Sequence, residues 1–193
     1  MIPSAADERS GDRLAGVLAI AGGLCWIAWA IANTVSRGAF EHSPEGSTPA
    51  RCAALLTAGW NLFLIPAALR LCQMLRAERP ALVPIWSAAG ILSLSFWAFG
   101  GLTTVTRPLE TTYLALAATW LLGIGSSMRS RHAALSAFTL VVGGFTAIDA
   151  VFSLFEPMPF ALYVLAAPKL PLSALWSFAV GAALLRRRVL AAE

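Results

Sequence analysis

The chain has 193 residues, of which 58% are apolar and 12% charged, and its mean hydropathy is +0.72. A soluble domain carries about twice that fraction of charge, roughly 25%, so much of this surface must face lipid. The composition excludes a soluble enzyme, a disordered tail and a secreted disulfide scaffold. The net charge of +4 does not indicate nucleic-acid binding, because the basic residues stand in short clusters between long apolar runs.

A helix that crosses the hydrocarbon core of a bilayer needs about 20 mostly apolar residues, and six windows of the sequence meet this need. The first, 14–35, is free of charge and longer than the apolar region of a signal peptide. The second, 52–75, contains Pro66 as a predicted kink. The third, 81–106, is the longest and ends before Arg107, which with the following proline suits a turn.

The other three windows lie at 110–128, 133–155 and 162–186. The last is the least regular, because Pro168 and Pro171 stand at its outer end. We therefore predict an all-α fold: one transmembrane domain over 1–193, a polytopic bundle of six transmembrane helices whose last helix is interrupted by proline at its outer end.

The basic residues predict the orientation of these spans. If the chain begins in the cytoplasm, ten of the fourteen Lys and Arg residues fall on the inner side and four on the outer side. Cytoplasmic loops of membrane proteins carry such an excess, so we expect both termini in the cytoplasm of a bacterial inner membrane. The four outer basic residues are Arg37, Arg51, Arg107 and Lys169.

Five ionisable residues gather near the predicted outer surface, where an unpaired charge is costly: Arg107, Glu110, Asp149, Glu156 and Lys169. At 1.5 Å per residue from the inner helix ends, Asp149 and Lys169 lie about 24 Å up and Glu110 about 27 Å. Asp149 and Lys169 stand on consecutive helices and should neutralise each other. The set is either an interfacial ring of long bases and helix-capping acids or a charged vestibule that binds a ligand.

Tryptophans occupy an unusual depth. Trp26, Trp60, Trp120 and Trp176 lie about 12 to 18 Å above the inner helix ends, whereas tryptophan usually marks the membrane interfaces. They predict an aromatic pocket for a small amphiphilic ligand, with Asn61 as its polar contact. The alternative is packing within the bundle, in which each indole N–H finds a neighbouring polar group.

Small residues predict close helix contacts, because membrane helices associate through glycine and alanine faces. The glycines expected to serve in this way include Gly22, Gly23, Gly123, Gly143, Gly144 and Gly181.

Three classes of function remain. The first is a protein that binds or transports a small organic molecule or ion through an outward-facing charged vestibule above a Trp-lined interior. The second is an accessory or structural subunit of a larger membrane complex. The third is a membrane-embedded enzyme that uses Asp149 or Glu156 as acid or base on a lipid-soluble substrate, although no nucleophile with an adjacent base is visible. The predicted ligand-binding residues are Arg107, Glu110, Asp149, Glu156, Lys169, Trp60, Asn61, Trp120 and Trp176.

The sequence contains no CxxC, P-loop, GxGxxG or metal-ligand spacing. We therefore expect no cofactor and no metal. The expected partners are the lipid bilayer, a small amphiphilic ligand, and either a second copy of the chain or a larger membrane complex. No nucleic-acid partner is expected.

Overall fold

The computed structural model describes residues 5–36, 44, 47–100, 107–155 and 168–190. Within these ranges the chain forms helices and no strand, which confirms the all-α prediction. The six helices are α1 (Ala5–Val35), α2 (Thr48–Leu75), α3 (Leu82–Gly100), α4 (Arg107–Met128), α5 (Ala133–Phe152) and α7 (Lys169–Leu190).

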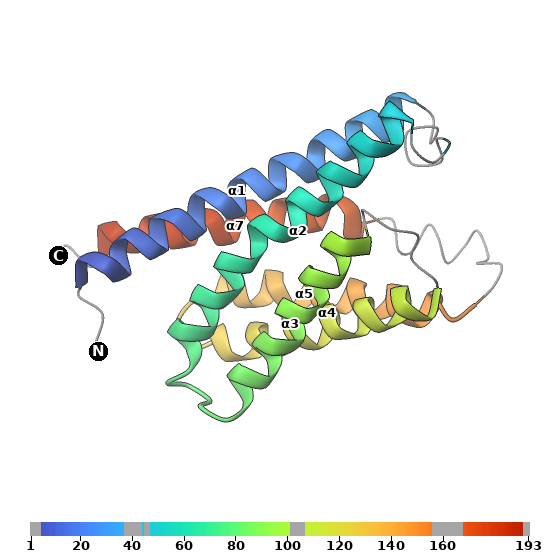
Figure 1. Cartoon of the computed structure of the whole chain (residues 1–193). Coiled ribbons are helices and arrows are strands. Elements are labelled where there is room, and N and C mark those ends of the chain that lie inside the picture. The colour runs from blue at the N-terminus through green and yellow to red at the C-terminus, as the bar shows by residue number, and fades with distance from the viewer. Residues whose placement is uncertain (1–4, 37–43, 45–46, 101–106, 156–167, 191–193) are drawn as a thin grey trace.

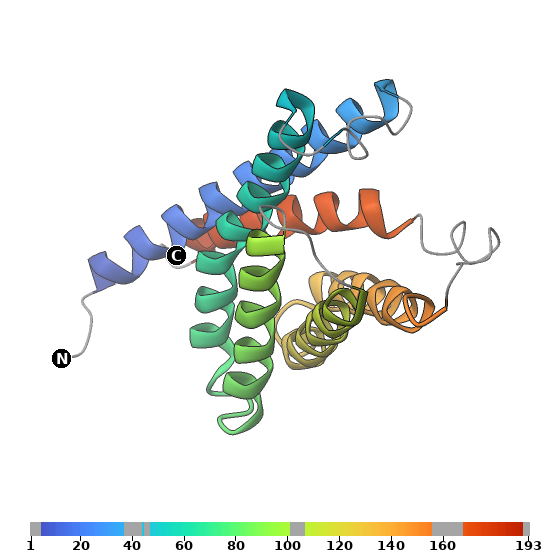
Figure 2. The same ribbon diagram turned by 45° about the vertical axis from the view of Figure 1, so that its right-hand side comes forward.

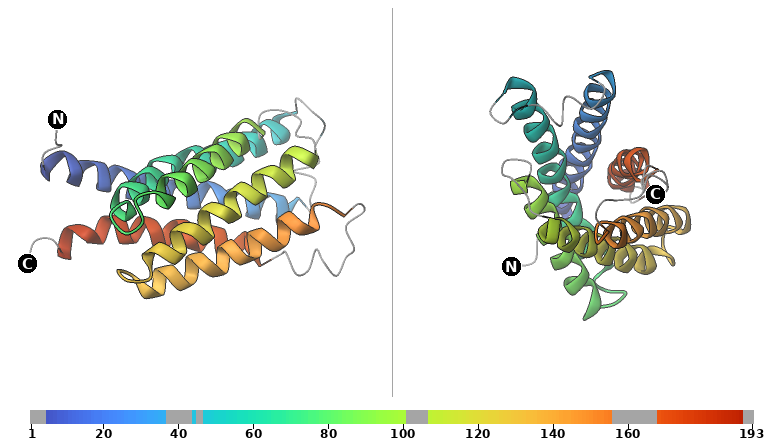
Figure 3. Two further views of the ribbon diagram at one scale, coloured as in Figure 1. Left: turned by 90° about the horizontal axis from the view of Figure 1, so that it is seen from below. Right: turned by 90° about the vertical axis from the view of Figure 1, so that its right-hand side faces the viewer.

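The helices form a ring in chain order (Figures 1 and 2). Helix α1 packs against α2 and α7, α2 also packs against α3, and α4 lies between α3 and α5. Helix α7 closes the ring between α5 and α1 (Figure 3), and its contact with α5 is the least extensive in the ring. The start of α1 and the end of α7 lie at one end of the bundle, which we call the terminal end (Figure 3).

Helices α1 and α2 begin earlier than the apolar windows predict. Helix α1 starts at Ala5 instead of residue 14 and includes Asp12, whose charge is matched by Arg70 of α2 at 2.5 Å. Helix α2 starts at Thr48 instead of residue 52, because the Ser47 hydroxyl accepts a hydrogen bond from the Ala50 N–H at 3.3 Å and caps the first turn. Hydropathy does not register the Ser47 cap of α2, nor the ion pair that accommodates a charge inside α1.

The ends of α4 and α5 that lie away from the terminal end also differ from the predicted windows. Helix α4 begins at Arg107 instead of residue 110, so Arg107 and the proline after it are helical and do not form a turn. Proline suits a first turn because the N–H that it lacks would have no helical acceptor there. Helix α5 ends at Phe152, and the next three residues form a turn.

Helix α7 begins at Lys169, whereas the predicted span begins at 162. Pro171 therefore stands in the first turn, where proline is tolerated. Residues 101–106 of the third predicted span and 162–167 of the last lie outside the described residues.

Four helices are long and apolar enough to cross a membrane: Arg9–Val35, Thr48–Leu75, Leu82–Gly100 and Ala133–Phe152. Helix α4 has Arg107 and Glu110 in its first turn, and helix α7 has three arginines near its end, at 186–188. Large apolar side chains also cover outward faces, as at Leu14, Leu24 and Ile31 of α1. Such a surface is unfavourable in water, and the fold is compatible with a membrane protein.

Glycines bring neighbouring helices close together, as the sequence predicts. A Cβ added at Gly16 would lie 2.9 Å from the Gly181 carbonyl oxygen, and one at Gly181 would lie 2.8 Å from that of Gly16. Helices α1 and α7 thus approach through their backbones. Gly144 differs from the prediction, because an added Cβ there meets nothing within 4 Å.

The core fills the centre of the ring. Its fully buried apolar side chains come from all six described helices, and the largest of them include Leu64, Val83, Ile124, Val142 and Val180. This packing fixes the relative positions of the helix ends, including the ends that hold the charged residues.

Candidate functional site

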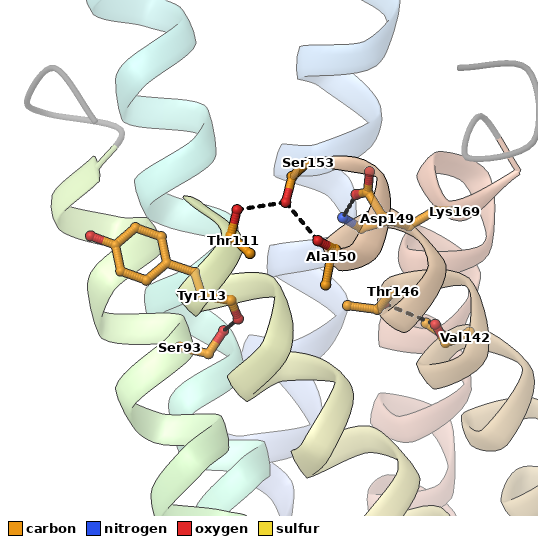
Figure 4. Close-up of polar contacts among 9 residues, drawn as sticks. All are labelled: Ser93, Thr111, Tyr113, Val142, Thr146, Asp149, Ala150, Ser153 and Lys169. Atoms are coloured by element: carbon orange, nitrogen blue, oxygen red, sulfur yellow. Dashed lines mark hydrogen bonds and ion pairs between the residues drawn. The ribbon is translucent and has the colours of Figure 1, made fainter. Parts of the chain in front are cut away.

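An ion pair joins the end of α5 to the start of α7, away from the terminal end. The Lys169 ammonium donates a hydrogen bond to the Asp149 carboxylate (Figure 4). The Lys169 and Asp149 side chains are 17% and 21% exposed, so the pair is mostly buried. The predicted meeting of these two residues is confirmed, while their role in binding a ligand remains a prediction.

Each of these charges is unfavourable on its own helix. Asp149 lies in the last turn of α5, where the helix dipole repels an anion, and Lys169 is the first residue of α7, where the dipole repels a cation. The opposite helix end attracts each charge, because the end of α5 is partially negative and the start of α7 partially positive. The pair is therefore stable only while these two helix ends stay together.

Hydroxyl groups link α4 to the same end of α5. The Thr111 and Ser153 hydroxyl oxygens are 2.7 Å apart, and the Ser153 hydroxyl donates to the Ala150 carbonyl at 2.7 Å (Figure 4). Because the single Ser153 proton is used in that bond, Thr111 donates to Ser153. These contacts hold α5 from the side opposite α7.

Three tryptophans from α1 and α2 lie near the start of α7. Trp26 stacks on Trp29 with ring centroids 4.7 Å apart and on Trp60 with centroids 4.3 Å apart. The Trp26 indole N–H donates to the Leu170 carbonyl at 2.8 Å, next to Lys169 in the chain. The Trp60 N–H donates to the Ser177 hydroxyl at 3.4 Å. This stack anchors the first turns of α7 to α1 and α2.

Trp120 and Trp176 form a second, separate group. Their rings meet edge to face with centroids 5.5 Å apart, and the Trp176 N–H donates to the Thr139 hydroxyl of α5 at 2.9 Å. Both are buried in the core. The four predicted tryptophans thus divide into two groups: Trp26 and Trp60 stack on each other, and Trp120 meets Trp176.

Asn61 is buried, and its amide donates to the Thr57 carbonyl of its own helix at 2.8 Å. Glu110 lies half-buried in the first turn of α4, where a negative charge favours the helix start. Arg107 is the first residue of α4, and its side chain lies outside the described part, as does all of Glu156. Of the five predicted charged residues, Asp149 and Lys169 are therefore the two that the described part of the structure brings together.

Among the described residues, no group of three His, Cys, Asp or Glu side chains could hold a metal ion. Sequence reasoning missed Trp29, Thr139 and Ser177, of which Trp29 and Ser177 carried a signal in their spacing. Trp29 stands three positions after Trp26 and shares its helix face. Ser177 stands eight positions, about two turns, after Lys169.

Comparison with known proteins gives no relative for this chain: no family model, no curated protein and no solved structure matches it. The functional interpretation therefore depends on the geometry of the site.

Proposed function

We propose that this chain is an integral membrane protein that binds or transports a small organic molecule or ion at the Asp149–Lys169 pair. The observation that carries the proposal is a mostly buried ion pair across the least extensive contact of the helix ring. A ligand that carries a positive and a negative group would interact with both side chains. It would replace the attraction that holds the two helix ends together and so open the contact between α5 and α7.

The placement of the pair argues against a purely stabilising role. Removing two charges from water costs free energy that their attraction only partly returns, and each charge also opposes the dipole of its own helix. An apolar pair would close the same contact without either cost. Charged residues within membrane helices usually serve ligands, ions or protons.

A second ion pair offers a matched control. Asp12 and Arg70 join α1 to α2 with exposed fractions of 14% and 18%, close to those of Asp149 and Lys169. Both lie away from the helix ends, and the Arg70 guanidinium also donates to the Gln73 side chain at 2.5 Å. This pair fits a structural role, so variants there should affect stability without affecting a ligand.

The decisive experiment exchanges the charges. The variant Asp149→Lys with Lys169→Asp restores an ion pair of opposite polarity. Purified wild-type and exchanged proteins are tested with glycine as a zwitterion, methylammonium as a cation and acetate as an anion, and thermal unfolding and flux into vesicles are measured. We expect a probe to raise the unfolding temperature of the wild type and to lose this effect in the exchanged protein.

The exchange Asp12→Arg with Arg70→Asp is the control and should keep the ligand response. If the Asp149–Lys169 exchange also keeps the response, the binding site lies elsewhere. If no probe binds or crosses and a stoichiometric partner co-purifies, the accessory-subunit alternative replaces this proposal.

The proposal includes six spans, both termini in the cytoplasm and a bacterial inner membrane. It is supported by the excess of basic residues near the terminal end, where α1 begins and α7 ends (Figure 3). A C-terminal reporter that folds only in the cytoplasm should be active, and the same reporter inserted after residue 44 should be inactive. The reverse pattern would contradict this orientation.

A further inference from the structure

Two polar groups stand out in the core between α3 and α4. Ser87 Oγ and Trp120 Nε1 are the buried side-chain oxygen and nitrogen atoms that have no hydrogen-bond partner within the described part of the chain. Their residues are 2% and 3% exposed. Other buried hydroxyls are bonded, as Ser93 is to the Tyr113 carbonyl at 3.0 Å. An unbonded N–H is especially costly in a protein surrounded by lipid.

The two groups belong to the same region of the interface. A Cβ added at Gly90 would lie 2.4 Å from Cγ and 2.7 Å from Cδ1 of Trp120, so the five-membered ring that contains Nε1 lies directly against Gly90. Ser87 precedes Gly90 by three positions and therefore stands one turn away on the same side of α3. Both unbonded groups therefore belong to the face of α3 that meets Trp120 of α4.

We infer that this region is a binding site for one small neutral molecule, of about the size of water, whose oxygen accepts a hydrogen bond from the Trp120 indole. The indole can only donate, so the bound atom must be an acceptor. The Ser87 hydroxyl both donates and accepts, and it supplies the second contact. An ion does not fit, because a buried charge without a partner is far more costly than a neutral dipole.

The site does not depend on the proposed function, but it adjoins the α5–α7 contact. Trp120 touches Trp176 edge to face, and Trp176 is bonded to Thr139 of α5. The bound molecule would therefore support the orientation of the Trp120 ring, which packs against Trp176 of the α5–α7 contact.

The first test is nuclear magnetic resonance of the full chain with ¹⁵N-labelled indoles. The seven tryptophans give separate N–H signals, and the Trp120 signal is the one lost in Trp120→Phe. We expect it at a hydrogen-bonded chemical shift, with a cross-peak to water when water is the bound molecule. A hydrogen-bonded shift without that cross-peak, lost on exhaustive delipidation, identifies a co-purified organic oxygen compound. A shift typical of an unbonded indole overturns the inference.

The second test is a double-mutant cycle. Ser87→Ala should lower the unfolding temperature of the wild type, because the bound molecule loses a partner, and should have no such effect in the Trp120→Phe background. Ser93→Ala is the control and should cause the same loss in both backgrounds. An equal effect of Ser87→Ala in both backgrounds overturns the inference.

If Trp120→Phe does not fold, the spectrum of Ser87→Ala decides the question. Loss of the Ser87 contact should move one indole signal, that of Trp120. If no indole signal moves, no molecule bridges the two groups and the inference is overturned.

Discussion

Two helix contacts in this molecule are built in opposite ways. Between α3 and α4, Trp86 lies against Gly123 and Trp120 lies against Gly90, so each helix presents an indole to a glycine of the other. Between α5 and α7, a smaller contact is closed by the Asp149–Lys169 pair and by the Trp176–Thr139 hydrogen bond. The first contact has no room for an added methyl group, whereas the second depends on polar partners that can be exchanged.

This difference separates a helix contact held by the shapes of its side chains from one held by polar partners. Interlocked rings and glycines resist displacement because any shift creates overlap or a cavity. Charged and hydrogen-bonded partners can be replaced by a ligand at little net cost when the ligand supplies equivalent groups. Variants at both contacts and at a surface ion pair test this difference.

The largest effect is expected at the interlocked contact. Gly123→Ala places a Cβ 2.2 Å from Cδ2 of Trp86, so the indole or the helix must move. We expect a loss of about 3 kcal/mol in the free energy of unfolding, at the upper end for overpacking. Unfolding in mixed micelles measures it. Gly144→Ala is the matched control and should cause no loss, because nothing lies within 4 Å of the new methyl group.

At the α5–α7 contact, removing one charge should destabilise the protein and removing both should not. Asp149→Asn leaves the Lys169 ammonium mostly buried without its counter-charge, and we expect a loss of about 2 kcal/mol, less than for a fully buried pair. Adding Lys169→Met should recover most of that loss. If the double variant is less stable than Asp149→Asn alone, the pair is a net stabilising element and the contrast with the α3–α4 contact fails.

A smaller effect is expected for the Trp176–Thr139 hydrogen bond, which also joins α7 to α5. A double-mutant cycle of Trp176→Phe and Thr139→Val should give a coupling free energy of about 1 kcal/mol, typical of one hydrogen bond. Thr139 keeps its own bond to the Leu135 carbonyl in the Trp176 variant, so no hydroxyl is left unbonded. A coupling near zero would mean that this contact is held at its outer end alone.

The smallest effect is expected at the terminal end. Glu78 and Arg131 form an ion pair at 2.7 Å with exposed fractions of 32% and 40%. Glu78→Gln should change the free energy of unfolding by less than about 0.5 kcal/mol, and the change should disappear in high salt, because solvent and ions screen exposed pairs. If Glu78→Gln lowers the free energy of unfolding as much as Asp149→Asn does, the exposed fraction of the side chains does not explain the difference between the two ion pairs.

The sequence by itself determined the helical class and the approximate position of each apolar helix, because the need for about 20 apolar residues without charge is a local property of the chain. It also predicted the pairing of Asp149 with Lys169, since two opposite charges near the same depth on consecutive helices have few other partners. The apolar windows begin after the observed starts of α1 and α2, because a helix can extend beyond its apolar part: α1 includes Asp12, which pairs with Arg70, and α2 is capped by Ser47.

Only the tertiary structure decided which tryptophans meet. Their depths are similar along the helix axes, but contact depends on the rotation of each helix and on its neighbours in the ring, which no local pattern contains. This rotation stacks Trp26 on Trp29 and Trp60, and brings Trp120 to Trp176. It likewise leaves the Ser87 hydroxyl and the Trp120 indole N–H without a hydrogen-bond partner among the described residues, because hydrogen bonding in the core is settled by the packing of all the helices together.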